Sequence, residues 1–160
     1  MADLVRAHAS AGTRWPRVDL AGLVATRLHE PGAVAAAYAA RRRRPLVAAT
    51  GQLMIIAADH PARGALRAGD RPDAMADRAE LLARLLVALD RPGVDGLLAA
   101  PDVVEDLLLL GALEDKIVFG SMNRGGLQGS VFEVDDRFTA YDATAIARHG
   151  LSGGKMLLRV

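Results

Sequence analysis

The sequence predicts an α/β protein with parallel strands. Short apolar runs that contain β-branched residues alternate with segments of helical periodicity, and this alternation is typical of βαβ units. The runs lack the polar alternation of a half-exposed strand, which favours strands covered on both faces, as in a parallel sheet. A chain of 160 residues, 51% of them hydrophobic, can form one domain with a packed core.

Two helices are expected before the first strand. The first covers residues 18–30, where leucines recur near helical spacing and Pro31-Gly32 ends the pattern. The second covers the alanine-rich residues 33–44 and stops before the next proline. Its four arginines, 41–44, either offset the partial negative charge at the carbonyl end of this helix or bind an anion, and we favour the first interpretation. We assign residues 1–50 to an N-terminal helical extension.

Strands and helices then alternate along the rest of the chain. Apolar runs predict strands at residues 52–58, 94–99, 116–119 and 155–160. Between them we expect a helix over residues 72–90 with a leucine stripe, a helix opened by Pro101, and a helix from Asp142, its N-cap, to Arg148. Right-handed crossovers of this kind place consecutive strands parallel to one another.

Four parallel strands allow two architectures. They can form a small open sheet, or the first half of a (β/α)₈ barrel, which typically needs about 250 residues. In a half-barrel, each uncovered apolar side chain of the inner face forfeits roughly 1.5–3 kcal/mol relative to burial. Four or five such residues approach the whole folding stability of about 5–15 kcal/mol. We therefore expect residues 51–160, if they form half a barrel, to belong to a homo-oligomer.

Composition excludes several classes of function. The 20 Lys and Arg residues balance 19 Asp and Glu residues, so a nucleic-acid partner is not expected. The chain has no cysteine, which excludes disulfides, thiolate metal sites and iron–sulfur clusters. No apolar stretch approaches the ~20 residues of a membrane span, and the N-terminus has no signal-peptide core. We expect a cytoplasmic protein with no membrane partner, no metal and no cofactor.

Reactive groups of parallel α/β folds lie at the carboxyl ends of the strands. Asp59 directly follows the first apolar run, and a desolvated carboxylate there suits proton transfer. Its alternative role is an N-cap, or a loop salt bridge with Arg63 or Arg67. His60 could carry a proton or bind a metal, although a hydrogen-bonded structural histidine is the preferred interpretation.

Two later segments add polar candidates. The long loop over residues 121–141 carries Asn123 and Arg124, and forms either a substrate-contacting lid or an ordinary surface excursion. Arg159 closes the fourth predicted strand. Lys155 opens that strand, so we expect it at the opposite end of the sheet, solvated or paired with an aspartate.

The strand ends also resemble a known family. The segments Leu-Met-Ile-Ile-Ala-Ala-Asp-His-Pro at 53–61, Val-Asp-Gly-Leu-Leu at 94–98, Ile-Val-Phe-Gly-Ser-Met-Asn-Arg-Gly-Gly at 117–126 and Gly-Gly-Lys-Met-Leu-Leu-Arg-Val at 153–160 carry the likeness. They resemble class I (Schiff-base) aldolases, in particular the deoxyribose-phosphate-aldolase-like (β/α)₈ proteins associated with inositol catabolism. The resemblance covers about residues 45–160.

This resemblance implies a partial TIM (β/α)₈ barrel and a lyase of carbohydrate catabolism. The reaction would be Schiff-base aldol cleavage of a small sugar or sugar phosphate. Asp59 matches the carboxylate that assists proton transfer, and we expect His60, Asn123, Arg124 and Arg159 to contact the substrate. The alternative is a non-catalytic half-barrel, or a small-anion-binding module, that self-associates.

The same resemblance places the Schiff-base lysine on the sixth strand and the phosphate site on the seventh and eighth. Neither region falls within these 160 residues. We therefore expect the chain to be the N-terminal half of a truncated enzyme that is inactive alone. Borohydride should then trap no substrate on it, and an adduct on Lys155 would contradict this expectation.

Overall fold

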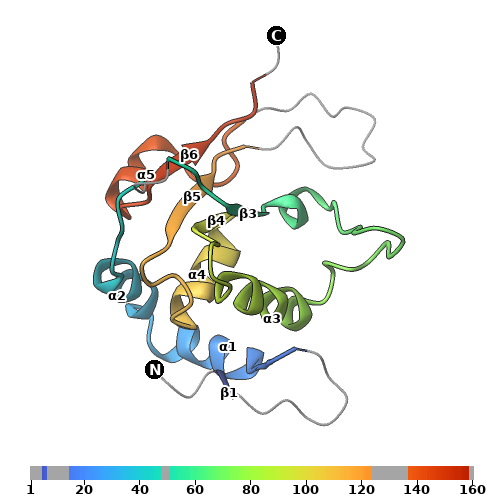
Figure 1. Ribbon diagram of the computed structural model, residues 1–160. Helices are drawn as coiled ribbons and strands as arrows, with labels where there is room; N and C mark the ends of the chain where they lie inside the picture. The colour runs from blue at the N-terminus through green and yellow to red at the C-terminus, as the bar shows by residue number, and fades with distance from the viewer. Residues whose placement is uncertain (1–4, 7–14, 48–50, 124–136, 159–160) are drawn as a thin grey trace.

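A four-stranded parallel sheet forms the centre of the molecule (Figure 1). The computed structural model describes residues 5–6, 15–47, 51–123 and 137–158. The strands pair in chain order, each parallel to the next: β3 (Ile55–Ala58), β4 (Gly96–Ala99), β5 (Ile117–Ser121) and β6 (Gly153–Lys155). The predicted α/β class and the parallel strand direction are thus confirmed. A sequential order is also the order of strands in the wall of a (β/α)₈ barrel.

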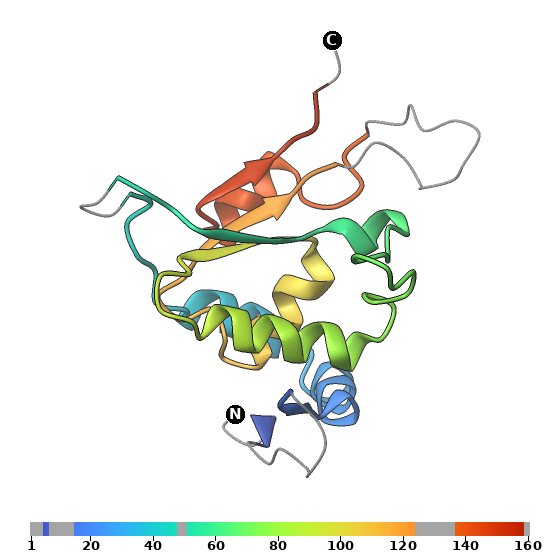
Figure 2. The ribbon, with the colours of Figure 1, turned by 45° about the vertical axis from the view of Figure 1, so that its right-hand side comes forward.

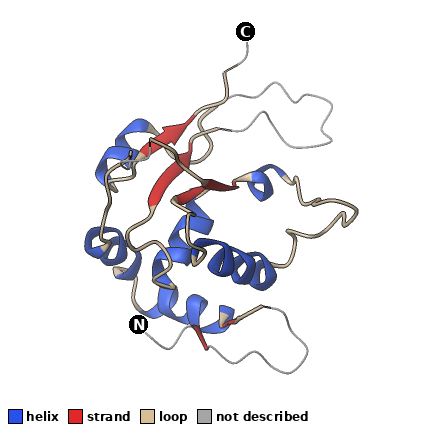
Figure 3. Ribbon diagram, in the orientation of Figure 1, coloured by secondary structure: helices blue, strands red, loops and turns tan. Residues whose placement is uncertain are grey.

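Helices connect the strands and cover the sheet (Figure 3). The crossovers contain α3 (Arg78–Leu89), α4 (Pro101–Leu109) and α5 (Ala143–Arg148), while a short 3₁₀ helix, η1 (His60–Arg63), follows β3. Before the sheet come α1 (Leu20–His29), α2 (Ala33–Ala40) and the antiparallel pair β1 (Val5–Arg6) and β2 (Arg17–Val18). In the described part of the chain, no helix is long and apolar enough to cross a membrane.

The helix boundaries follow local signals. The Asp77 side chain accepts a hydrogen bond from the Glu80 amide at 2.8 Å and caps α3, which begins at Arg78, six residues after the predicted start. Pro101 occupies the first turn of α4, and the Asp142 carboxylate caps α5 through the Ala145 amide at 2.6 Å, both as predicted. These starts set where the crossover helices leave the carboxyl ends of the strands.

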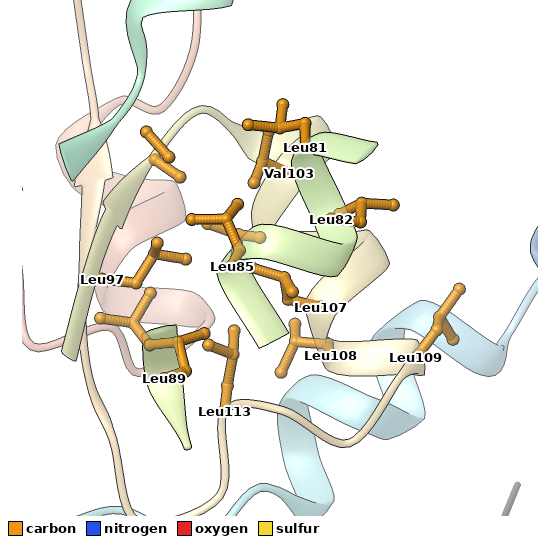
Figure 4. Close-up of a cluster of buried hydrophobic side chains, with 14 of the residues drawn as sticks. Leu81, Leu82, Leu85, Leu89, Leu97, Val103, Leu107, Leu108, Leu109 and Leu113 are labelled. Atoms are coloured by element: carbon orange, nitrogen blue, oxygen red, sulfur yellow. The ribbon is translucent and has the colours of Figure 1, made fainter. Parts of the chain in front are cut away.

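One face of the sheet packs on the helices and forms the core. The side chains of Leu97 and Val118 point to this face and are fully buried. Leucines from α3 and α4, with Leu107 near the centre, fill the space beneath them (Figure 4). Because strand residues alternate between faces, this packing fixes which side chains lie on the opposite face.

The opposite face of the sheet is open (Figure 2). Ala57, Leu98, Phe119 and Gly153 are register partners across the four strands and lie on this face. Ala57 is exposed, and Leu98 and Phe119 are only half-buried. No helix of the described residues packs on this face, which corresponds to the inside of a barrel wall.

The last strand lies earlier in the sequence than predicted. The structure places β6 at Gly153–Lys155 rather than at residues 155–160, because the two glycines allow close packing. A Cβ atom at Gly153 would lie 2.8 Å from the Phe119 ring, and one at Gly154 would lie 2.5 Å from the Met122 sulfur. The prediction that Lys155 lies at the opposite end of the sheet from the reactive groups is therefore wrong. Lys155 ends β6 at the carboxyl edge.

The arginine run begins at the carbonyl end of helix α2, as predicted, and two of its side chains also contact the sheet. Helix α2 ends at Ala40, four residues before the predicted end, and Arg41 is its C-cap. Anion binding by this run stays a prediction. Arg41 is 5% exposed and donates to the carbonyl oxygens of Lys116 at 2.8 Å and Gly150 at 3.1 Å. Arg44 pairs with Asp95 at 2.7 Å. These side chains fasten the N-terminal helices to the amino ends of the strands.

Candidate active site at the carboxyl ends of the strands

Three strand ends bring an acid, a hydroxyl and an amine together. Asp59 follows β3, while Ser121 and Lys155, the last residues of β5 and β6, are register partners. The Ser121 hydroxyl donates to Asp59 Oδ2 at 3.2 Å. Lys155 Nζ lies 3.3 Å from the same oxygen. The structure therefore places Asp59 at the predicted edge of the sheet and adds two partners to it.

The surroundings of this acid differ from those of its amine partner. The Asp59 side chain is 1% exposed, whereas the Lys155 side chain is 28% exposed. A buried carboxylate is costly unless it is paired and hydrogen-bonded, and here the ammonium and the hydroxyl supply both interactions. The pair thus links a buried oxygen to a solvent-accessible nitrogen. Such a pair can pass a proton between a bound molecule and the protein interior.

His60 lies beside the acid without a hydrogen bond to it. It begins η1, its side chain is 45% exposed, and its Nδ1 is 3.7 Å from Asp59 Oδ1. This distance is too long for a hydrogen bond, so the contact becomes an ion pair only when the imidazole is protonated. Asp59 precedes η1 but does not cap it with its side chain. The N-cap alternative for Asp59 is therefore not realised.

Asn123 is held by the backbone that follows β6. Its side chain is 2% exposed, its Nδ2 donates to the Leu157 carbonyl at 3.2 Å, and its Oδ1 accepts from the Leu157 amide at 2.7 Å. These bonds fix the chain just beyond Lys155. A contact between Asn123 and a substrate stays a prediction. Arg124 and Arg159, the other two predicted contacts, lie outside the described residues.

A cavity of about 300 Å³ opens at the same edge of the sheet. Ser121 and Asn123 line one part of it, and Ala100, Pro101 and Asp102, where α4 begins, line another. Ligands of parallel α/β sheets bind outside the carboxyl ends of the strands, which is where this cavity lies. A larger cavity, about 490 Å³, lies among residues of α3 and residues 110–116, away from Asp59.

The described residues hold no group of three His, Asp or Glu side chains that could bind a metal ion. The chemistry visible at this edge is that of a carboxylate, a primary amine, a hydroxyl and an imidazole. These groups serve proton transfer and covalent attack by the amine. The available arrangement is therefore that of an acid–base site built around a buried carboxylate.

Sequence reasoning missed two members of this site. The sequence did not place Ser121 beside Asp59, and Lys155 was expected at the wrong end of its strand. Alternate residues of a strand point to the same face of the sheet, so Ser121 lies on the same face of β5 as Phe119. This alternation could have been recognised in the sequence. For Lys155 the usable signal was the glycine pair before it, since glycine in a strand often marks close approach of a neighbour.

The fold and the site together define a parallel α/β protein that has the strand order of half a barrel and an acid–amine pair at its reactive edge. A family model described as Cgl0159-like matches residues 51–160, and the chain belongs to this family.

A solved structure supports this assignment. The crystal structure of Cgl0159 from Corynebacterium glutamicum (Brevibacterium flavum) is similar to this chain, with 52% sequence identity and a TM-score of 0.80. The match covers 84% of this chain and 45% of that chain, so this chain spans less than half the length of the solved protein. No curated protein matches the sequence.

Proposed function

We propose that this chain provides the first half of the active site of a Schiff-base aldolase-type lyase of carbohydrate catabolism. The substrate is a small sugar or sugar phosphate, and inositol catabolism is the setting that the family resemblance indicates. One observation carries the proposal. The buried carboxylate of Asp59, at the carboxyl end of the first sheet strand, touches both the Lys155 amine and the Ser121 hydroxyl.

Aldol cleavage needs a base at the bond that breaks. The base removes the proton of the hydroxyl group next to that bond, the carbon–carbon bond then breaks, and an aldehyde leaves. An iminium group formed on a lysine accepts the electron pair as an enamine. Asp59 is the base in this scheme, because it is held in place by two hydrogen-bond donors and stands at the edge of the sheet that faces ligands.

The rest of the site fits a small polar substrate. A cavity of about 300 Å³ has the volume for a molecule of sugar size, and Ser121 and Asn123 give it polar walls; Ser121, not Asp59 itself, connects it to the acid. His60 adds an exposed imidazole at the rim. Arg124 and Arg159, which lie outside the described residues, stay proposed polar contacts of the substrate.

The test is aldehyde release from sugar phosphates, including deoxyribose 5-phosphate, measured by coupled reduction with NADH. The chain is assayed alone and together with the complementary half of the C. glutamicum protein, because the match spans 45% of that protein. We expect release that falls about 10²–10⁴-fold in Asp59→Asn. Asp90→Asn, an exposed acid at the end of α3, should leave it unchanged. No release in either setting, or release unaffected by Asp59→Asn, refutes the proposal.

The open face of the sheet favours a second function, a half-barrel that associates with another copy of itself. Ala57 is exposed on this face, and Leu98 and Phe119 are only half-buried. Burying them in a dimer recovers roughly 25 cal/mol for each Å² of apolar surface removed from water. Light scattering after size exclusion should show a dimer that Phe119→Glu dissociates. A well-folded monomer at high protein concentration would contradict this function.

A further inference from the structure

Strand β6 is short, and Lys155 is its last residue. Residues 156–158 beyond it belong to no strand, and their side chains are exposed. The backbone of Leu157 nevertheless has a fixed partner, which is the side chain of Asn123. From this arrangement we infer that Asn123 is a positioning residue, which holds the backbone that carries Lys155 so that the ammonium group stays against Asp59.

The amide side chain of Asn123 takes the place of a strand partner. Its Nδ2 donates to the Leu157 carbonyl at 3.2 Å, and its Oδ1 accepts from the Leu157 amide at 2.7 Å. A carboxamide carries the same donor and acceptor as a peptide group. These two bonds therefore continue, through a side chain, the pairing of β5 with β6 that ends at Ser121 and Lys155. Asn123 is the one asparagine of the chain and is 2% exposed, so its burial is stabilised by these bonds.

The distance at Asp59 makes the position of this backbone matter. Lys155 Nζ lies 3.3 Å from Asp59 Oδ2, at the long end of the hydrogen-bond range. A displacement of about 1 Å at the carboxyl end of β6 would therefore separate the two groups. Ser121 and Asn123, two residues apart, thus serve the same acid in different ways. Ser121 donates to it directly at 3.2 Å, and Asn123 acts through Lys155.

The amino end of β6 supplies a matched control. The Ser152 hydroxyl, just before this strand, accepts a hydrogen bond from the Val118 amide at 3.1 Å. Like the bonds between Asn123 and Leu157, it joins a side chain to a backbone 34 positions away and ties β6 to β5. It lies at the other end of the strand from Lys155. Removing the Ser152 hydroxyl should therefore weaken the attachment of β6 without moving Lys155.

The kinetic consequence of this inference rests on the proposed function. In that scheme Asp59 is the base, and a base that loses the ammonium group holding it reacts more slowly. Substrate affinity should stay the same, because Asn123 in this role does not touch the substrate. A direct contact between Asn123 and the substrate, which the sequence predicts, has the opposite signature, since loss of uniform binding raises KM and leaves kcat unchanged.

The first test follows Lys155 without turnover. The whole chain is treated with limiting acetic anhydride, and acetylation of Lys155 and Lys116, its two lysines, is compared by peptide mass spectrometry. An ammonium group bonded to a carboxylate must leave it before it reacts, so Asn123→Ala should raise the rate at Lys155 relative to Lys116 about 5-fold. Ser152→Ala should leave this ratio unchanged. A general loss of stability exposes both lysines and does not produce a change confined to Lys155.

The second test separates positioning from substrate contact. In the aldehyde-release assay, Asn123→Ala should lower kcat about 10-fold and change KM by less than about 2-fold, whereas Ser152→Ala should change neither. Asn123→Asp keeps the acceptor for the Leu157 amide but loses the donor, so both effects should be intermediate, and this variant serves alone if Asn123→Ala does not fold. An acetylation ratio at Lys155 that neither Asn123 variant changes, or a raised KM at unchanged kcat, overturns the inference.

The inference and the proposed function fail in different ways. A raised acetylation ratio at Lys155 in Asn123→Ala, without aldehyde release from any sugar phosphate, rejects the proposed function and keeps the inference. Aldehyde release with an unchanged acetylation ratio rejects the inference and keeps the proposed function.

Discussion

Removing Lys155 from the Asp59–Lys155 pair should destabilise the protein more than removing Asp59. Lys155→Met leaves a carboxylate that is 1% exposed and has lost the nearer of its two described basic neighbours, Lys155 and His60. Asp59→Asn leaves an amine whose side chain is 28% exposed and can be hydrated. A buried carboxylate that loses its ammonium partner is costlier than a partly exposed amine that loses its acid, so Lys155→Met should lose more stability than Asp59→Asn.

The distance between the two groups sets the scale of the loss. At 3.3 Å and an effective dielectric constant of about 20, Coulomb's law gives about 5 kcal/mol as an upper bound. Breaking a buried pair from one side costs about 3–5 kcal/mol, and the partial exposure of Lys155 reduces this figure. We expect about 2–4 kcal/mol for Lys155→Met and about 0–1 kcal/mol for Asp59→Asn. The double variant should recover part of the loss, with a coupling energy of about 1–3 kcal/mol.

Urea unfolding followed by circular dichroism measures these free energies. The matched control is the pair of Arg71 and Glu80, which has the same 3.3 Å separation but lies on the surface. Arg71→Met should change stability little, and 1 M salt should remove what effect there is. Two results would refute the reasoning: a Lys155→Met variant no less stable than Asp59→Asn, or single-variant losses that simply add in the double variant.

Three further predictions concern the core and its edges. Leu107→Ala, at a fully buried leucine, should cost about 3–5 kcal/mol in urea unfolding, whereas Leu28→Ala, at a leucine 71% exposed, should cost far less. Tyr38→Phe removes a buried hydroxyl that lies 2.6 Å from the Tyr141 hydroxyl, and should cost about 1–3 kcal/mol in the same assay. Burial lowers the pKa of His149, so the unfolded chain binds its proton more readily and stability should fall as the pH drops through 6.5. His149→Phe should remove the part of the stability loss at low pH that protonation of His149 causes. Melting temperatures measured from pH 8 to 5 check this, and an unchanged pH dependence of stability would contradict the prediction.

Much of the fold could be predicted because its signals are local. Pro101 marks a helix start by its fixed φ angle and Asp142 by a hydrogen bond that spans three residues, and the leucine stripe of α3 repeats within one helix. The parallel strand order follows from crossovers that each contain a helix. Asp59 could be placed for the same reason, since its position depends only on where the first apolar run ends.

The last strand could not be predicted from local preference. Residues 156–158 are apolar and suit a strand, yet Met156 is 52% exposed and Leu158 is 73% exposed beyond the sheet. The pairing with β5 selects Gly153–Lys155 instead, because Phe119 occupies the space that a side chain at Gly153 would need. This steric condition joins residues 34 positions apart, and it decides which end of the sheet receives Lys155.

The partners of the arginine run could not be predicted from the sequence for a similar reason. Arg41 donates to carbonyl groups that lie 75 and 109 positions further along the chain. Burial lowers the pKa of Arg41, because desolvation penalises its charge. A run of four arginines in a sequence gives no indication of such distant acceptors, so it is interpreted as a helix end or an anion-binding patch.

The reactive groups and the uncovered apolar residues share one face of the sheet. Alternation along β5 puts Phe119 and Ser121 on the same side, and register then puts Gly153 and Lys155 beside them. A second copy or a further segment that covered this face would therefore also shield the Asp59–Lys155 pair. Excluding water there strengthens the interaction between the two charges, because the local dielectric constant falls. Completion of the fold and the strength of the ion pair thus depend on the same surface, so a charge at Phe119 that blocks association should also reduce the coupling energy between Asp59 and Lys155.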